Sequence, residues 1–233
     1  MRYIYLLIIL SLFSCNNERT LQLPEIKNAE VTEVLDVSPA YIFYDESQPD
    51  STLLNRKNLI ITTNWLVNVD KRLTLQQAIP HIKFLQDKKR NAEMHKNEDA
   101  KNYFTCHDTS IGNLGFLEFT DVVFKENIKI DTVYYKDNMR TEENLKRIEG
   151  FHASSTIPLI FKDGHHFEIG EQNLIMDELK NKLDKLMKIN FNGIHLQLYF
   201  NKNLSFQEYI SIKRKVNSLT SDLISMDLNE FIY

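Results

Sequence analysis

The sequence contains few of the residues that mark several common protein classes. Of its 233 residues only two are cysteine, six are glycine and five are proline. Two cysteines cannot build the disulfide framework of a small secreted domain. Scarce glycine and proline disfavour a loop-rich, phosphate-cradling or collagen-like chain. The net charge of −4 argues against a dedicated nucleic-acid binder, because neutralising phosphates requires a basic surface.

Recognisable catalytic motifs are also missing from the sequence. It has no P-loop, no glycine-rich dinucleotide turn and no serine nucleophile elbow. We therefore expect no cofactor and no enzyme activity. The chain is otherwise ordinary, with 26% charged and 42% hydrophobic residues, and its length suffices for one good core or two small ones.

The N-terminus has the features of an export signal. Met1 and Arg2 give a short basic start, and Tyr3–Phe13 is an apolar run interrupted only by Ser11. This run is shorter than the roughly 20 residues of a bilayer span but matches the hydrophobic region of a signal peptide. It ends in Leu-Phe-Ser-Cys, which resembles a bacterial lipobox and implies acylation at Cys15. The alternatives are an uncleaved membrane anchor and a plain secretory signal with an incidental cysteine.

Composition and patterning divide the chain into four parts. The predicted fold class is α+β, with small mixed sheets, helices packed on one face, and two tandem related ββαβαβ-like modules. We expect a signal peptide at 1–14, a poorly ordered polar tether at 15–29, an N-terminal α+β module at 30–150 and a second α+β module at 151–233.

The stretch Ile194–Lys215 carries the strongest local signal. Its first seven residues alternate between apolar and polar, which predicts a half-buried strand. A polar turn at 201–203 follows. Ser205 and Glu208 then stand at capping-box spacing, which predicts a helix start. The residues that follow at helical spacing are Phe206, Tyr209, Ile210, Lys213 and Val216.

An earlier stretch repeats this order. Leu59–Val69 predicts a strand, and Thr74 and Gln77 stand at capping-box spacing before a helical apolar stripe that reaches Leu85. Pro80 would kink a helix that begins at Thr74, so the helix starts either there or at Pro80. Four identities share one offset (202 − 71 = 131): Lys71/Lys202, Leu73/Leu204, Gln76/Gln207 and Ile79/Ile210. We infer a tandem duplication; the alternative is a chance match between two capped helices.

Periodicity and turn chemistry predict the remaining elements. Expected strands are Tyr41–Tyr44, Phe116–Phe124, Ile128–Tyr135, Ile157–Phe161, His165–Ile169 and a last one at 223–226. Expected helices are Asn138–Ile148 and Ile175–Met187, the latter with a Glu178–Lys182 pair. Expected irregular regions are a loop at Asp45–Thr52, a solvated charged stretch at Gln86–Asn102, a tight turn at Asp163-Gly164 and a linker at Gly150–Thr156.

Three groups of residues invite a chemical role. Cys106-His107-Asp108 would suit a nucleophile or a metal, but neighbours on an extended chain point apart. His165 and His166 could bind a metal together with His152 or His195, although adjacent strand histidines face opposite sides. Four aromatic residues could line a glycan or peptide site but are more typical of a sheet core: Trp65, Tyr41, Phe43 and Tyr44. We expect no catalytic, cofactor or metal residues here.

The second half resembles the periplasmic domain of the ExbD/TolR family of biopolymer-transport proteins, over about residues 157–233. The shared features are the Asp163-Gly164 turn, the Glu178-Leu179 helix start and the Asn201–Phe206 turn. The resemblance implies a periplasmic, binding and dimerising fold. The family's ion-driven membrane aspartate has no counterpart, since no acidic residue lies between Met1 and Cys15.

We therefore expect a cell-envelope lipoprotein that faces the periplasm or the cell surface. It would be a non-catalytic binding or scaffold module associated with energy-transducing biopolymer transport. The expected partners are an envelope protein or peptidoglycan, the membrane through the lipid anchor, and a second copy of the chain. The alternative is a stand-alone envelope lipoprotein with no link to transport.

Overall fold

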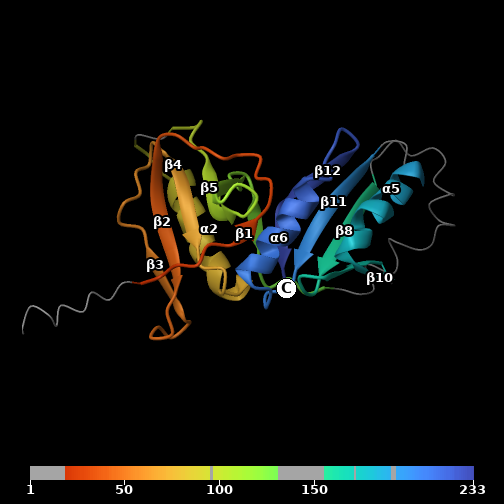
Figure 1. Cartoon of the computed structure of the whole chain (residues 1–233), viewed down its shortest axis with the longest axis horizontal. Coiled ribbons are helices and arrows are strands. Elements are labelled where there is room, and N and C mark those ends of the chain that lie inside the picture. The colour runs from red at the N-terminus through yellow and green to blue at the C-terminus, as the bar shows by residue number, and fades with distance from the viewer. Residues whose placement is uncertain (1–18, 95–96, 131–154, 171, 190–192) are drawn as a thin grey trace, which may run out of the picture.

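The computed structural model describes residues 19–94, 97–130, 155–170, 172–189 and 193–233. Within these residues the chain forms two mixed sheets of six strands each and three α-helices, which is the predicted α+β class. The two sheets stand side by side, with α6 (Phe206–Asn217) between them (Figure 1).

The first sheet has the strand order β1-β5-β4-β2-β3, and β6 pairs with β5. Strands β1, β2, β4 and β5 run parallel, whereas β3 and β6 are antiparallel to their neighbours. The bounds are β1 Glu25–Ile26, β2 Val37–Tyr44, β3 Thr52–Asn55, β4 Asn64–Val69, β5 Asn102–Asp108 and β6 Asn113–Glu118. Helix α2 (Leu75–Arg90) connects β4 to β5, and its apolar stripe is buried.

The second sheet has the order β10-β9-β8-β11-β12-β7. Its bounds are β7 Val123–Lys125, β8 Ser155–Phe161, β9 His166–Ile169, β10 Gln172–Ile175, β11 Ile194–Phe200 and β12 Ile224–Ile232. Strands β8, β11, β12 and β7 are parallel. A 3₁₀ turn at Met176–Glu178 leads into α5 (Leu179–Ile189), and α6 connects β11 to β12.

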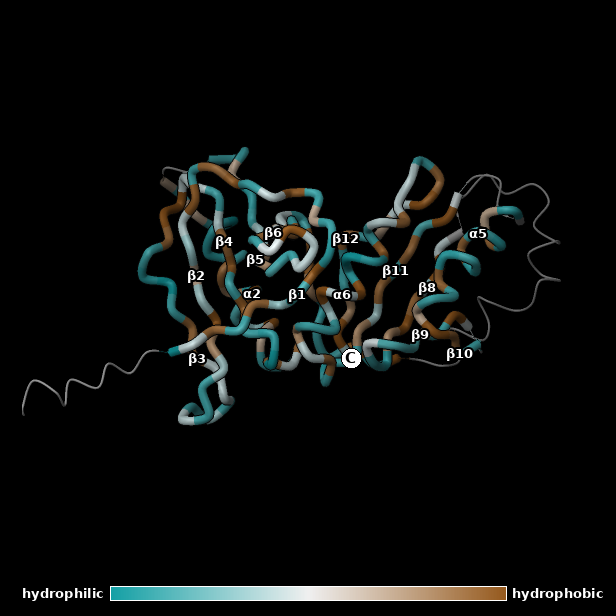
Figure 2. The backbone as a smooth tube through the Cα atoms, in the orientation of Figure 1, coloured by the Kyte–Doolittle hydropathy of each residue, from teal (hydrophilic) through white to brown (hydrophobic). Residues whose placement is uncertain are grey.

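The core follows from the alternation of apolar side chains along the strands. Strand β11 is buried at every second residue, as the sequence predicts. Figure 2 shows hydrophobic residues along the strands and a largely polar loop between β2 and β3. Buried residues of both sheets and all three described helices belong to one contiguous cluster. The two sheets therefore share a hydrophobic core.

The strand–capped-helix predictions are confirmed, with two corrections. Strand β4 begins at Asn64 rather than Leu59, because Ile60–Thr63 form a turn closed by a backbone hydrogen bond of 3.4 Å from the Thr63 amide to Ile60 O. Helix α2 begins at Leu75 and contains Pro80, so a helix start at Pro80 is wrong. The capping box at Thr74 and Gln77 fixes the start five residues earlier.

The β8–β9 hairpin is confirmed, but its turn is not the expected two-residue one. Asp163 accepts from the amides of His165 and His166 at 2.8 and 2.7 Å and so closes a longer loop. Gly164 does not adopt a positive φ there; it allows close approach, since a Cβ on it would lie 2.7 Å from Cγ of Glu208.

Several boundaries differ from the predictions. Ile175 ends β10 instead of starting a helix, and Lys182 donates to Gln172 rather than pairing with Glu178. The 116–124 stretch divides into β6 and β7, and β3 was not predicted. Residues 128–130 form no strand. The rest of that expected strand, the helix at 138–148 and the linker up to residue 154 lie outside the described residues; Ser155 and Thr156 belong to β8.

Two polar stretches are more ordered than expected. From Arg19 onward the predicted tether is part of the fold, and β1 pairs with β5. The charged stretch after Gln86 is not wholly solvated, because Gln86 and Lys89 are buried. Both use their polar ends to bind backbone carbonyls.

Candidate functional site at the junction of the two sheets

Two turns with matching sequences meet at the junction. Each follows a central parallel strand and starts a helix. In the second turn, Ser205 Oγ accepts from the Glu208 amide at 3.2 Å, and Glu208 Oε2 accepts from the Ser205 amide at 2.7 Å. In the first turn, Gln77 Oε1 accepts from the Thr74 amide at 2.9 Å. The caps hold both helix starts rigidly where the sheets meet.

The two turns bind each other through a symmetric set of backbone hydrogen bonds. The amide of Leu75 donates to Leu204 O at 2.9 Å, and the amide of Phe206 donates to Leu73 O at 2.6 Å. A second pair runs from Gln76 to Lys202 O and from Gln207 to Lys71 O, at 2.9 and 3.2 Å. The two bonds of each pair are related by the offset of 131 found in the sequence. The donor of the second bond lies 131 residues after the donor of the first (206 − 75), and its acceptor lies 131 residues before the acceptor of the first. The two turns therefore match in their contacts as well as in their sequence.

Side chains make similar reciprocal contacts between the two halves of the chain. On α2, Lys83 pairs with Glu126 beside β7, and 131 positions later on α6, Arg214 pairs with Glu30 at 2.8 Å. Phe104 of β5 packs edge-to-face on Phe206, with ring centroids 5.1 Å apart. Such aromatic contacts add to the burial that holds the sheets together.

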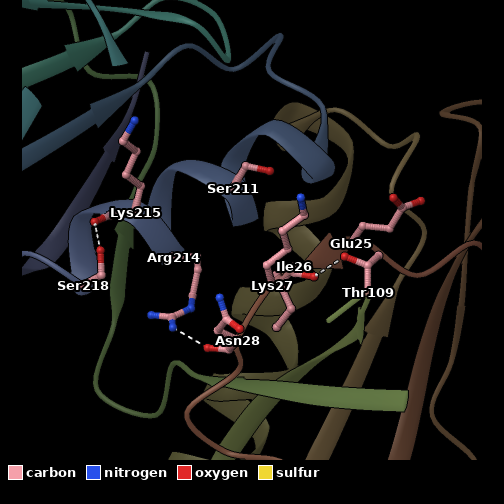
Figure 3. A pocket seen from close by; sticks show the side chains of 9 residues that line it. All are labelled: Glu25, Ile26, Lys27, Asn28, Thr109, Ser211, Arg214, Lys215 and Ser218. Carbon is pink, nitrogen blue, oxygen red and sulfur yellow. Dashed lines mark hydrogen bonds between the residues drawn. The ribbon is translucent and has the colours of Figure 1, made fainter. Parts of the chain in front are cut away.

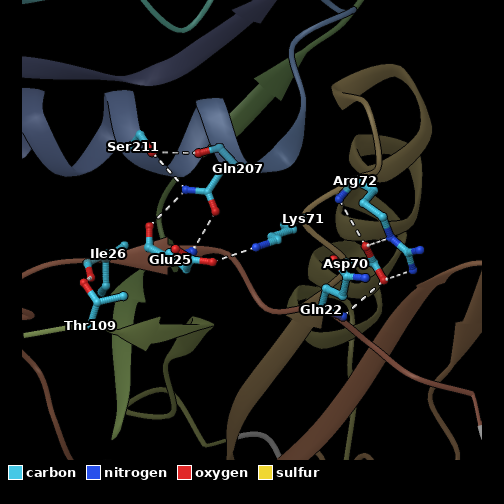
Figure 4. Close-up of polar contacts among 9 residues, drawn as sticks. All are labelled: Gln22, Glu25, Ile26, Asp70, Lys71, Arg72, Thr109, Gln207 and Ser211. Carbon is cyan, nitrogen blue, oxygen red and sulfur yellow. Dashed lines mark hydrogen bonds and ion pairs between the residues drawn. The ribbon is translucent and has the colours of Figure 1, made fainter. Parts of the chain in front are cut away.

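A polar network links β1 to α6 (Figure 4). The side-chain amide of Gln207 accepts from the Glu25 amide at 2.7 Å and donates to Glu25 O at 3.0 Å. Lys71 donates to Glu25 Oε1 at 2.7 Å, and this hydrogen bond holds the pKa of Glu25 below its usual value. Burial raises the pKa of Asp70, but hydrogen bonds from Arg72 outweigh burial and leave that pKa lowered. Both carboxylates are therefore ionised at neutral pH and serve as hydrogen-bond acceptors within the fold.

A groove lies over this network, between β1 and the outer face of α6 (Figure 3). Its volume is about 510 Å³, and it is open to solvent. It combines acidic and basic groups with hydroxyls, from Glu25, Ile26, Lys27, Asn28, Thr109, Ser211, Arg214, Lys215 and Ser218. A second cavity of about 540 Å³ lies beside the first turn and includes Thr74, His81 and Asn203. Such shallow, mixed-charge surfaces suit a polar peptide better than a small apolar ligand.

The Cys106-His107-Asp108 stretch lies on β5, and its side chains are separated as strand alternation requires. Cys106 is fully buried, and burial raises the pKa of its thiol to about 12. Asp108 accepts from the hydroxyl and amide of Ser110 and from the Ala29 amide, and these bonds lower its pKa to about 2. Cys106 therefore stays a thiol at neutral pH, and Asp108 ties the chain after β1 to β5.

The predicted histidine and aromatic candidates do not converge. His166 binds Asp163 at 3.0 Å, His195 lies 3.0 Å from Ser225 Oγ, and His152 falls outside the described residues. In the described part of the chain no three His, Cys, Asp or Glu side chains are placed to hold a metal. Trp65 is buried and donates to Ile60 O, whereas Tyr41 and Phe43 stack on each other with ring centroids 5.8 Å apart.

Sequence reasoning missed most of the groove residues. Glu25 and Gln207 are 182 positions apart, and nothing in either local sequence points to the other. The one signal in the sequence was that glutamine occurs at both positions, 76 and 207, that are related by the offset of 131. It marked the paired turns but not the strand β1 that they bind.

Cys15 lies outside the described residues. Over the part of the chain that the structure describes, no helix has the length and apolar character needed to cross a bilayer. Comparisons of the chain with models of known protein families, with curated proteins and with solved structures find no match.

Proposed function

We propose that the chain is a cell-envelope lipoprotein whose folded part is a non-catalytic binding or scaffold module, associated with energy-transducing biopolymer transport. The observation that carries the proposal is the Leu-Phe-Ser-Cys sequence that ends the apolar N-terminal run, with Cys15 as the acylated residue. Several acyl chains together give stable membrane attachment, whereas one chain gives only marginal binding.

The order β8-β9-α5-β11-α6-β12 supports the ExbD/TolR-like part of the proposal. It matches the ββαβαβ order expected from the resemblance, with β10 as an addition after the hairpin. The capped turn after β11, on which the resemblance partly rests, is built into the junction through its backbone. Any homodimer of this chain would have to use another surface, because the two turns already bind each other.

The proposed partner is an envelope protein or peptidoglycan, bound in the groove or along a sheet edge. The groove residues Glu25, Lys27 and Lys215 offer both charges to a polar peptide. Strand addition at an exposed sheet edge is a common way to bind an extended segment, and β3 ends the first sheet. Each route uses backbone and polar contacts rather than catalysis.

Replacing Cys15 tests the anchor. Cys15→Ser is expected to move the protein from the membrane fraction to the soluble fraction and to remove labelling by a radioactive or clickable fatty acid. Cys106→Ser is the matched control and should leave both unchanged, because Cys106 is buried within β5. Unchanged fractionation of the Cys15 variant, with no label on the native protein, would rule out lipoprotein attachment.

Crosslinking in intact cells, followed by purification of the native chain, tests the partner. Recovery of an envelope motor complex or of peptidoglycan would support the scaffold proposal. Recovery of a monomer with neither would favour the stand-alone lipoprotein.

A further inference from the structure

The described chain begins at one end of the first sheet and is fixed there. Arg19 pairs with Asp45, just after β2, at 3.5 Å. The Gln22 amide donates to Asp70 Oδ2 at 3.2 Å, and Gln22 O accepts from the Lys71 amide at 2.8 Å, just after β4. Figure 1 shows the chain starting beside the lower ends of β2 and β3, and Figure 4 shows Gln22 next to Asp70. Residues 19–22 therefore lie at the carboxyl ends of the parallel strands.

Very little chain separates this point from the proposed anchor. Only Asn16, Asn17 and Glu18 lie between Cys15 and Arg19. Even when fully extended, four residue steps span at most about 14 Å. An acylated Cys15 sits at the membrane surface, so Arg19 and the loop that it contacts cannot lie much farther away than this.

We propose that the bilayer surface lies against this end of the first sheet, with the β2–β3 loop (Asp45–Ser51) as the membrane-proximal element. The inference rests on the proposed acylation of Cys15. Strands β2 and β4 then run toward the membrane, and their first residues, Val37 and Asn64, lie at the far end. An eight-residue strand places those ends about 25 Å apart.

The surface chemistry fits attachment by the tether rather than by charge. The loop carries Asp45, Glu46 and Asp50, which anionic lipids would repel. Two exposed apolar residues flank the opposite end of the first sheet: Leu35 lies beside the start of β4 and Ile60 beside the start of β2, and they are 72% and 56% exposed. They lie at the end of the sheet away from the proposed bilayer surface and therefore do not insert into it.

Energy transfer to the membrane surface tests this orientation. The full-length acylated protein, purified from membranes, would carry a fluorophore on Ser47→Cys in the loop or on Thr62→Cys near the start of β4. Cys106 stays unlabelled because its thiol is buried. In phosphatidylcholine vesicles with headgroup-labelled acceptor lipid, position 47 is expected to transfer clearly more energy than position 62. A wash in concentrated salt should not release the protein.

A lengthened tether is the control. About 20 Gly/Ser residues inserted between Asn17 and Glu18 should free the body to rotate and bring the two transfer efficiencies together. Equal or reversed efficiencies in the vesicle-bound native chain would overturn the orientation alone. A native chain that carries no acyl group and fails to bind vesicles would overturn the proposed function as well.

Discussion

Lys89 and Glu230 are charged side chains in apolar surroundings, and they are compensated differently. Among the described residues Lys89 has no carboxylate partner; its ammonium donates to Thr63 O, Lys101 O and Asn102 Oδ1 at 3.0–3.1 Å and lies 5.1 Å from the Trp65 ring centre. Burial lowers its pKa to about 8. Glu230, by contrast, pairs with Lys213 and accepts from the Tyr209 hydroxyl at 2.7 Å.

Lys89→Met should destabilise the fold by about 1–3 kcal/mol, because two buried oxygens and one part-buried oxygen lose their donor. It should also change the pH dependence of unfolding. The folded pKa of Lys89 is about 8 against an ordinary 10.5, so between these values the unfolded chain holds more protons and native stability rises with pH. Urea unfolding across this range should show that rise in the native chain and a smaller one in the variant. Parallel curves would contradict the pKa shift.

Glu230→Gln should cost about 3–5 kcal/mol, since it leaves the Lys213 ammonium buried without a counter-charge. The double variant Lys213→Met with Glu230→Gln should recover part of this loss. The equivalent position in α2 is Ile82, which shows that an apolar side chain fits such a helix face (213 − 131 = 82). Calorimetric unfolding of both single variants and the double variant measures the coupling; additive losses would exclude it.

At the scale of elements, the sequence predicts those strands and helices that are determined by interactions between residues close together in the chain. The β11–α6 unit follows from alternation and a capping box, and both are present in the structure. Strand β1 was not predictable, because two residues hold no periodicity and their order comes from β5 and Gln207. The groove was missed for the same reason. The burial of Lys89 likewise depends on contacts with Trp65 and with the connection between β4 and β5. The spacing of residues along its own helix does not predict these contacts.

Pro80→Ala should stabilise the protein by up to about 3 kcal/mol, because it restores the backbone donor to Gln76 O inside α2. The matched control is Ser211→Ala at the corresponding position of α6, where the backbone donor is already present. It should lower stability by about 0.5–1.5 kcal/mol, because the Ser211 hydroxyl makes hydrogen bonds with Gln207, so a gain in stability would be specific to the proline. Urea midpoints at constant m-value measure both, and a less stable Pro80 variant would mean that the proline is needed for packing.

At the scale of the molecule, the paired turns join two sheets into one core. The four junction amides sit between capped helix starts, and the surrounding residues belong to a single buried cluster. Separation of the sheets would break all four backbone bonds and expose Phe104 and Phe206 together. We therefore expect one cooperative unfolding transition.

Hydrogen exchange measured by NMR tests this cooperativity. The amides of Leu75, Gln76, Phe206 and Gln207 should share one opening free energy, close to that of the β4 and β11 amides. Rapid exchange of the two α2 amides with slow exchange of the two α6 amides would indicate independent halves.

The position of β7 determines where a recombinant fragment of the protein can begin. Val123–Lys125 precedes the second half in the chain, yet it hydrogen-bonds to β12 as the outermost strand of that half's sheet. A recombinant fragment that starts at residue 151 would leave β12 with an open edge, which invites aggregation. A fragment that starts ahead of Val123 keeps this strand but still loses the junction hydrogen bonds and the shared core, so crystallisation and binding assays should use a chain that contains both sheets.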